Sequence, residues 1–227
     1  MAAPGASEVV VVVTGGDPVD PAHLPALEPG AFVVAADSGI DRALALGLRV
    51  DLAVGDFDSV DPDALRQVTE AGATIERHPA AKDATDLELA LDAALVRRPR
   101  QIVVIGGHGG RLDHLLANAL LLAAPAYATV DVVAQMGPAR VTVVRSLALL
   151  HGEEGDLVSL VALHGGATGV TTEGLLYPLR GEDLHPGSTR GVSNELIDPQ
   201  AEVRLRTGVL LVVQPGQPGT HHLARNP

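Results

Sequence analysis

The sequence contains no cysteine and no tryptophan, and aromatic residues make up only 2% of its 227 residues. Without cysteine the chain has no disulfide, no thiolate nucleophile and no cysteine ligand for zinc, which fits the reducing environment of the cytoplasm. The whole aromatic supply is Phe32, Phe57, Tyr127 and Tyr177. The sequence therefore predicts an aliphatic core, and it argues against a binding mode that stacks nucleic-acid bases on aromatic rings.

Basic side chains are scarce as well. The 28 Asp and Glu residues outnumber the 16 Lys and Arg residues, so the formal net charge is −12. This charge argues against a nucleic-acid partner. Lys82 is the only lysine. It suggests a position that needs a compact ammonium group rather than a planar guanidinium, with chance as the alternative.

The chain also lacks a long apolar run. The valines at residues 9–13 form a stretch far shorter than the roughly 20 residues that a membrane-spanning helix needs. Residues 1–8 contain no basic side chain of the kind that opens a secretory leader. Because 46% of the residues are hydrophobic, the material for a core is ample. We expect a folded cytoplasmic protein with no membrane partner.

Up to about residue 137, short apolar runs of strand type alternate with helical patterns. The run at 9–13 is continuously β-branched, as in a strand buried on both faces of a parallel sheet. Asp61 before Pro62, and the capping box of Thr85 and Glu88, predict two helix starts. The alternation predicts an α/β domain with a doubly wound parallel sheet. Its expected strands are residues 9–13, 32–36, 52–54, 74–77, 101–105 and 131–134.

After Gly137 and Pro138 the pattern changes to short alternating runs separated by glycine and proline. Such runs predict a small all-β sandwich or barrel. The expected strands are residues 140–145, 156–163, 168–173, 201–206 and 209–213. We therefore expect an α/β domain over residues 1–137, a β-sandwich domain over residues 138–215 and a mobile tail over residues 216–227.

Two carboxylates, Asp56 and Asp58, follow the expected strand at 52–54. Residues two apart in an extended chain point to the same side, with Cα atoms roughly 6.5–7 Å apart, so both can hold one hard cation. Magnesium suits such a site, because it accepts one or two carboxylates and completes its shell with waters and substrate phosphates. The alternative is a β-turn in which both side chains face water.

Polar residues gather at the carboxyl ends of several expected strands. In parallel sheets, ligands bind outside these ends. The concentration of glycine and charge there favours a binding site at that edge of the sheet. The segments are Gly15-Gly16-Asp17, Asp37, Asp56 with Asp58, residues 82–86 and residues 106–114.

The last of these segments is rich in glycine. Gly106, Gly107, Gly109 and Gly110 lie between an expected strand and an expected helix, and Arg111 follows them. Glycine lets backbone N–H groups approach an anion, and the helix N-terminus adds a positive end, so the loop predicts contact with a phosphate. A tight turn without a ligand is the alternative.

The segment 82–86 and the histidines allow two interpretations each. Either a carboxylate of Asp83 or Asp86 joins the metal while Lys82 meets a phosphate, or both carboxylates serve only the dipole of the following helix. His108 and His114 belong to the glycine-rich loop, where we expect a hydrogen bond to a nucleotide or substrate rather than a zinc site.

Taken in order, these motifs resemble those of the thiamine pyrophosphokinase family, whose members transfer a diphosphate from ATP to the hydroxyl of thiamine. The likeness covers nearly the whole chain. Its matching segments are Ala-Asp-Ser-Gly at 36–39, Gly-Asp-Phe-Asp-Ser at 55–59, Lys-Asp-Ala-Thr-Asp at 82–86, the loop 106–114, Gly-Leu-Leu-Tyr-Pro-Leu at 174–179, Gly-Ser at 187–188 and Gly-Val-Ser-Asn-Glu at 191–195.

The resemblance implies an ATP-binding α/β domain, a β-sandwich that helps to bind thiamine, and a homodimer with sites between subunits. It implies that Asp56, Asp58 and Asp86 hold Mg²⁺ and that Lys82 assists catalysis. The implied ATP-binding residues are Asp37, Asp83, Gly106, Gly107, Gly109, Gly110, Arg111, Asp113 and His114. The implied thiamine-binding residues are Tyr177, Ser193 and Asn194. Some family members pack a tryptophan on the thiamine ring, for which Tyr177 or an aliphatic side chain is the candidate here.

Two other functions fit the same motifs. In a metal-dependent nucleotide phosphohydrolase, water would replace thiamine, and the second domain would have no role. In a non-catalytic sensor of nucleotide or thiamine, binding would occur without turnover. The three functions differ in whether AMP and thiamine diphosphate are formed together.

Overall fold

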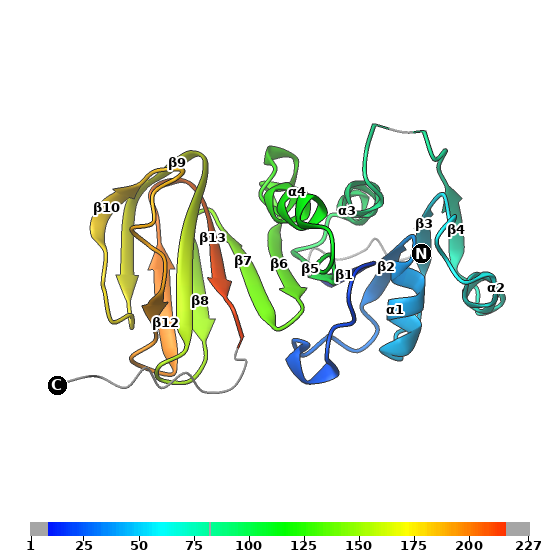
Figure 1. Ribbon diagram of the computed structural model, residues 1–227, viewed down its shortest axis with the longest axis horizontal. Coiled ribbons are helices and arrows are strands. Elements are labelled where there is room, and N and C mark those ends of the chain that lie inside the picture. Colours follow the sequence, from blue (N-terminus) through cyan, green and yellow to red (C-terminus); the bar gives the residue numbers. More distant parts are fainter. Residues whose placement is uncertain (1–8, 82, 217–227) are drawn as a thin grey trace.

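The computed structural model describes residues 9–81 and 83–216 (Figure 1). The expectations for Lys82 and for residues 217–227 of the tail lie outside these residues. The first six strands are β1 (Val9–Thr14), β2 (Phe32–Ala36), β3 (Leu52–Gly55), β4 (Thr74–Arg77), β5 (Gln101–Ile105) and β6 (Asp131–Met136). They pair in the order β4-β3-β2-β1-β5-β6, and every pair is parallel. The predicted parallel α/β arrangement is confirmed.

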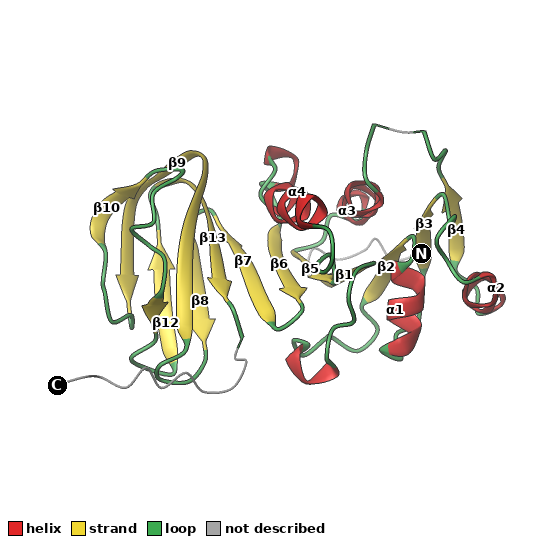
Figure 2. Cartoon of the chain, in the orientation of Figure 1, coloured by secondary structure: helices red, strands yellow, loops and turns green. Residues whose placement is uncertain are grey.

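The alternation of side chains along β1 explains why helices cover both faces of this sheet. Val10 and Val12 enter one apolar core, and Val11 and Val13 enter another. The first core is covered by α3 (Asp86–Val96) and α4 (Leu112–Leu122), and the second by α1 (Gly39–Ala45) and α2 (Pro62–Glu70). Figure 2 shows α3 and α4 on one side of the sheet and α1 on the other.

The two predicted helix starts are present. The Asp61 carboxylate accepts a hydrogen bond from the N–H of Asp63, with Pro62 at the first helical position of α2. The Thr85 hydroxyl accepts one from the N–H of Glu88 at the start of α3. The longest helices, α3 and α4, have 11 residues each. Among the described residues, no helix is long and apolar enough to cross a membrane.

The second half of the chain is rich in β-strands, as predicted. They are β7 (Ala139–Val144), β8 (Leu147–His151), β9 (Leu157–Glu173), β10 (Arg180–Leu184), β11 (Asn194–Glu195), β12 (Gln200–Arg204) and β13 (Thr207–Gln214). These strands pair in the order β7-β13-β9-β12-β8, with β10 and β11 on β9, and they fold around a third apolar core. An α/β domain followed by a β-rich domain is therefore the fold of this protein.

One expectation about these strands is wrong. The strands expected at 156–163 and 168–173 are parts of a single strand, β9, which begins at Leu157, is 17 residues long and runs through Gly165 and Gly166. Glycine between two apolar runs predicts a break between strands, but here it marks an irregularity in one strand. The pairing of β9 with β13 shifts register between Gly208 and Leu210 and then continues. The strands β8, β10 and β11 were not predicted.

The two halves share one sheet. Gly137 and Pro138 form the turn of an antiparallel pair in which Met136 of β6 faces Ala139 of β7. Strand pairing thus continues across the boundary proposed between residues 137 and 138, and the domain limits stay a prediction. The turn is compact, because a Cβ at Gly137 would lie 2.6 Å from the His108 ring.

Arg145 joins the C-terminal end of α4 to the β-rich half. Its guanidinium donates to the carbonyls of Ala123 and Ala124 at 2.8 and 3.0 Å. These carbonyls lie at the end of α4, where cations are favoured by the helix dipole. Burial lowers the pKa of Arg145, so the guanidinium pays a desolvation cost that these bonds offset.

We expect Arg145→Met to lower the free energy of unfolding by about 1–3 kcal/mol, because it removes the guanidinium from the partly buried carbonyls of Ala123 and Ala124 and leaves Ala123 with only the His164 contact. Urea unfolding followed by circular dichroism measures the change. Arg66→Met is the control, since the Arg66 side chain is 61% exposed and pairs only at the surface. Equal stability of the two variants would contradict the role given to Arg145.

Candidate active site

Strand register brings Asp37 and the Asp56 loop together. Ala36 of β2 pairs with Val54 of β3, and the N–H of Asp37 donates to the carbonyl of Val54 at 2.9 Å. Gly55 makes this approach possible, because a Cβ there would lie 3.2 Å from the Asp37 backbone and its φ is +152°. The carboxylates that end β2 and β3 therefore meet at one edge of the sheet.

Three of these carboxylates are close enough to share one cation. Ligand oxygens of Asp37, Asp56 and Asp58 all lie within 4.8 Å of one another. Asp56 Oδ1 accepts a bond from the N–H of Asp58 at 3.2 Å, and Asp58 Oδ1 accepts one from the Ser59 hydroxyl at 2.8 Å. The Oδ1 atom of Asp37 is buried and makes no hydrogen bond. The donor set consists of hard oxygen atoms, which suit Mg²⁺.

The neighbouring charges and burial act on the same carboxyl group. Burial raises the pKa of Asp37 above its ordinary value, and the negative charges of Asp86, Asp56 and Asp58 raise it further, against a lowering hydrogen bond from the Ser38 backbone. The family resemblance implies Asp56, Asp58 and Asp86 as metal ligands and Asp37 as an ATP-binding residue. The structure puts Asp37 in the close group, while Asp86 acts on it from the first turn of α3. The individual roles stay predictions.

Arg77 is a residue of this site that sequence analysis missed. Its guanidinium carbon lies 4.9 Å from the centroid of the Phe57 ring, and its Nη1 donates to the carbonyl of Asp56 at 3.4 Å. Phe57 itself is buried and has a left-handed φ of +61°. Arg77 thus contacts the strained residue between Asp56 and Asp58 from the end of β4. A basic side chain at a strand end on the predicted edge was the available signal.

The glycine-rich loop after β5 packs against the loop after β1. The N–H of Asp17 donates to the carbonyl of His108, and the N–H of Gly107 donates to that of Gly15, each at 2.9 Å. Contact is close enough that a Cβ at Gly109 would lie 2.4 Å from the Asp17 carboxyl carbon. These two loops meet where the strand order reverses between β1 and β5, which is the position at which parallel sheets bind ligands.

Two more side chains outside the sequence predictions hold these loops. Asn118, a buried polar residue of α4, donates to the carbonyl of Gly107 at 3.0 Å. Arg42 of α1 donates to the carbonyl of Gly16 at 3.1 Å. A lone asparagine in the apolar run of residues 115–124 was the signal for the first. We find no sequence signal for Arg42.

The predicted phosphate ligand Arg111 is oriented by a carboxylate. Its guanidinium makes two bonds to Asp113, at 2.6 and 3.2 Å, and both side chains are exposed at the start of α4. The hydrogen bond from Arg111 lowers the pKa of Asp113 to about 2. His114 and Asp83 are exposed as well. The ATP-binding roles predicted for these residues stay predictions.

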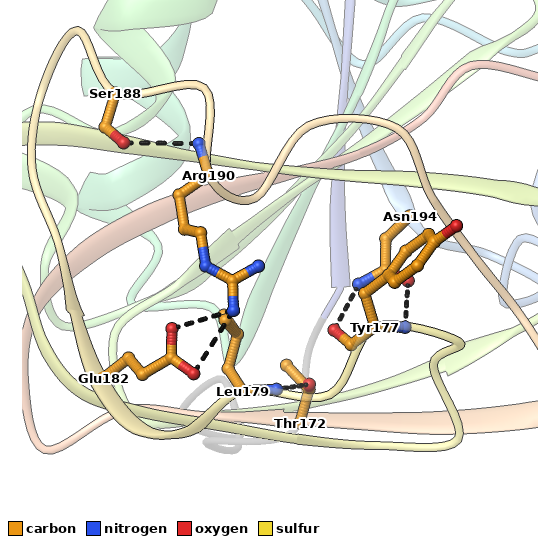
Figure 3. A network of polar contacts seen from close by, with 7 residues as sticks. All are labelled: Thr172, Tyr177, Leu179, Glu182, Ser188, Arg190 and Asn194. Atoms are coloured by element: carbon orange, nitrogen blue, oxygen red, sulfur yellow. Dashed lines mark hydrogen bonds and ion pairs between the residues drawn. The ribbon is translucent and has the colours of Figure 1, made fainter.

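The residues predicted to bind thiamine form a second group. The N–H and the carbonyl of Tyr177 are both bonded to the Asn194 side chain, at 2.9 and 2.8 Å (Figure 3). Ser193 precedes Asn194 and is exposed. This group belongs to the β-rich half, since β11 pairs with the first residues of β9. Figure 1 shows β9 and β10 at one end of the longest axis and β3 with β4 at the other, so one chain does not bring the two groups together.

Comparison with known proteins agrees with this division into two parts. The family profile described as "Thiamin pyrophosphokinase, catalytic domain" matches residues 26–134, and "Thiamin pyrophosphokinase, vitamin B1 binding domain" matches residues 146–210. Thiamine pyrophosphokinase of Bacillus subtilis (strain 168) is 29% identical over 183 residues, which cover 80% of this chain and 86% of that protein.

Solved structures agree as well. The crystal structure of thiamine pyrophosphokinase from Bacillus subtilis has a TM-score of 0.81 at 26% identity, covering 92% of this chain and 100% of its own. The thiamin pyrophosphokinase family protein from Enterococcus faecalis has a TM-score of 0.73 at 30% identity, covering 92% and 98%.

The fold and the family matches together define a two-domain enzyme of the phosphate-transferring class, with an acidic group at the edge of a parallel sheet and a β-rich domain that continues the sheet. The matches identify the family. This chain belongs to the thiamine pyrophosphokinase family.

We expect Asp37→Asn to stabilise the metal-free protein at about pH 7. The Asp37 carboxyl has a higher pKa in the folded protein than in the unfolded chain. The stability linked to it is therefore fully present below its unfolded pKa and is lost as the pH rises from there through its folded pKa. The free energy of unfolding of the Asp37→Asn variant does not decrease in this pH range for this reason, because the amide does not titrate. Its advantage should shrink as the pH is lowered toward about 4.

Thermal unfolding in EDTA at several pH values measures the difference. Asp198→Asn is the control, because Asp198 is an exposed carboxylate outside the group. Lower stability of Asp37→Asn than of the parent protein at neutral pH would contradict the prediction. In a separate measurement without EDTA, added Mg²⁺ should stabilise the parent protein more than the variant.

Proposed function

We propose that this protein transfers the diphosphate of ATP to the hydroxyl of thiamine, giving thiamine diphosphate and AMP in the cytoplasm. The hydroxyl oxygen attacks the β-phosphorus in line, and the bond from that phosphorus to the oxygen of AMP breaks. Family membership supports the reaction, and the close group of Asp37, Asp56 and Asp58 is the observation that carries it. The absence of cysteine and the overall acidity fit the cytoplasm and a small-molecule partner.

Mg²⁺ is the proposed cofactor. The residues that would hold it are Asp37, Asp56 and Asp58, with Asp86 beside them. Their fit rests on hard oxygen donors from two loops and on the Asp37 Oδ1 atom, which is buried and makes no hydrogen bond. When bound, the ion would supply positive charge for the phosphate oxygens, which the carboxylates alone would repel.

Backbone and side-chain groups of the protein are proposed to bind the phosphates and to orient the attacking hydroxyl. The proposed phosphate contacts are backbone N–H groups of residues 108–110 and the guanidinium of Arg111, which Asp113 orients. The N–H groups of Gly106 and Gly107 already donate to the carbonyls of Gln135 and Gly15. Lys82 is proposed to neutralise the same phosphates. Asp86, at the first position of α3, is proposed to orient the hydroxyl or accept its proton. Phosphoryl transfer depends mainly on such positioning and charge stabilisation.

One assay tests the reaction against its alternatives. The protein is incubated with ATP, Mg²⁺ and thiamine, and AMP and thiamine diphosphate are quantified. Equal amounts of both products support the proposal. Nucleotide breakdown without thiamine would indicate a phosphohydrolase, and binding without products would indicate a sensor. Activity should vanish when EDTA removes the divalent ion.

We expect Asp56→Asn to lower kcat by at least about 100-fold while the protein stays folded, because the variant loses a charged ligand of the metal group. Steady-state kinetics and circular dichroism provide the two readouts. Asp63→Asn is the matched control, since Asp63 is a nearby carboxylate on α2 whose side chain is 78% exposed. Normal turnover by Asp56→Asn would remove this residue from the mechanism.

We further propose that the enzyme is a homodimer whose sites lie between subunits. The metal group and the Tyr177 group lie in opposite halves of one chain, and a second copy can bring them together (Figure 1). A face suited to contact is present on α4, where Leu112, Leu116 and Leu120 are spaced one turn apart and are 67%, 55% and 49% exposed. Such an apolar stripe is typical of a buried interface.

Mixing two inactive variants tests the shared site. Asp56→Asn damages one half, and Tyr177→Ala with Ser193→Ala damages the other. After subunit exchange, half of the dimers should be mixed with one intact site each, so about a quarter of the original activity should return. Activity no greater than the sum of the separate variants, with exchange verified by mass, would show that each chain forms its own site.

A further inference from the structure

The acidic group at the sheet edge depends on a turn at Phe57. Strand β3 ends at Gly55, and Phe57 adopts a left-handed φ of +61° between Asp56 and Asp58. Across this turn the N–H of Asp58 donates to Asp56 Oδ1 at 3.2 Å. The two carboxylates therefore approach each other because the chain bends at Phe57, and not because it continues as an extended strand. The left-handed conformation costs free energy for a bulky residue, so the surroundings must hold it.

Contacts with the core hold one side of this turn. The Phe57 side chain is 9% exposed and belongs to the same apolar core as Ala53 and Val60. The N–H of His78 donates to the carbonyl of Gly55 at 2.9 Å, which ties the start of the turn to the segment after β4. These contacts anchor the ring and the residue that precedes the turn.

Arg77 holds the turn from the side of the solvent. It is exposed at the end of β4, where it pairs with Gly55 in the parallel register of β3 and β4. Its guanidinium carbon lies 4.9 Å from the centroid of the Phe57 ring, and its Nη1 donates to the Asp56 carbonyl at 3.4 Å. Among the described residues, Arg77 forms no ion pair with a carboxylate. Its guanidinium therefore acts on the ring and the backbone of the turn.

We propose that Arg77 is a positioning residue, which holds the turn at Phe57 so that Asp56 and Asp58 are aimed at a shared Mg²⁺ ion before the ion binds. The ring face attracts the guanidinium, and the bond to the Asp56 carbonyl ties the same side chain to the backbone. A turn that is ordered in advance loses less entropy when the ligand binds. The inference rests on the proposed function, because Mg²⁺ is the cofactor proposed for this group.

The positive charge of Arg77, taken alone, predicts the opposite effect on the metal. A fixed cation beside the acidic group repels a divalent cation, so its removal would tighten Mg²⁺ binding if charge were its only contribution. Positioning predicts weaker binding, because the turn must then be ordered at the expense of the binding free energy. The sign of the change in affinity separates the two roles.

Mg²⁺ titration of the metal-free, full-length protein tests the inference. Arg77→Met keeps an unbranched stem and removes the guanidinium. It should raise the dissociation constant for Mg²⁺ about threefold, the loss of one exposed cation–π contact. The rise of the melting temperature with Mg²⁺ concentration, without nucleotide, gives this constant. Arg77→Lys keeps a cation that can lie over the ring, so it should bind Mg²⁺ more tightly than Arg77→Met.

A double-mutant cycle shows whether Arg77 acts through Phe57. Phe57→Leu keeps a buried apolar side chain and removes the ring face, so it should also weaken Mg²⁺ binding. Because both changes remove the same contact, the double variant should be no worse than the more affected single variant. If Phe57→Leu does not fold, Phe57→Met replaces it in the cycle.

Arg97→Met is the matched control. The guanidinium carbon of Arg97 lies 3.7 Å from the centroid of the Phe32 ring, so the same kind of contact exists on the same sheet. Phe32 is the first residue of β2, at the end of that strand opposite to Asp37. Arg97→Met should therefore lower the melting temperature in EDTA while the dissociation constant for Mg²⁺ stays that of the parent protein.

Several outcomes would overturn the inference. Unchanged or tighter Mg²⁺ binding by Arg77→Met would mean that Arg77 does not position the carboxylates. Equal weakening by Arg97→Met would mean a general effect of stability, and effects that multiply in the double variant would mean that Arg77 does not act through Phe57. Absence of Mg²⁺ stabilisation in the parent protein would refute the proposed cofactor and this inference together, so the two failures are distinguishable.

Discussion

The parallel pairing of β1 through β6 is the constraint on which the rest of the structure depends. Since all six strands point the same way, every segment that leaves a carboxyl end emerges at one edge of the sheet. The pairing of Ala36 with Val54 then makes Asp37 a neighbour of Gly55, two carboxylates become adjacent, and a third follows two residues later. The backbone ladder thus holds together charges that repel one another. The pKa of Asp37 is raised mainly by burial and further by this repulsion.

Several side chains support the site without being proposed contacts of the metal or the phosphates. Arg77 contacts the loop that carries Asp56 and Asp58. Asn118 of α4 holds the glycine-rich loop, and Asp113 orients Arg111. In the β-rich half, Asn194 holds the turn of Tyr177 in the same manner. Such supporting contacts matter because a reacting group must be held close to its productive position, and loops alone are mobile.

Local signals were enough to predict the α/β half. The β-branched run of β1, the Asp61 cap and the capping box at Thr85 depend on neighbouring residues only, and all are present. The β-rich half was predicted less well, because whether glycine interrupts or bends a strand such as β9 is decided by its partners in the sheet. Likewise, the closeness of Asp37 to Asp56 and the hydrogen bonds between the Asn194 side chain and the Tyr177 backbone arise from tertiary contacts between separate loops.

The position of β1 has a consequence for synthesis. β1 lies between β2 and β5, and its pairing with β5 joins Val9 to Gln101. During translation one edge of this valine-rich strand therefore stays unpaired until the chain has grown past residue 105, well after β2 to β4 have been made. Unpaired apolar edges invite association with other chains. The danger of aggregation thus falls on the growing polypeptide, whereas in the finished protein the same strand is the most protected part of the sheet.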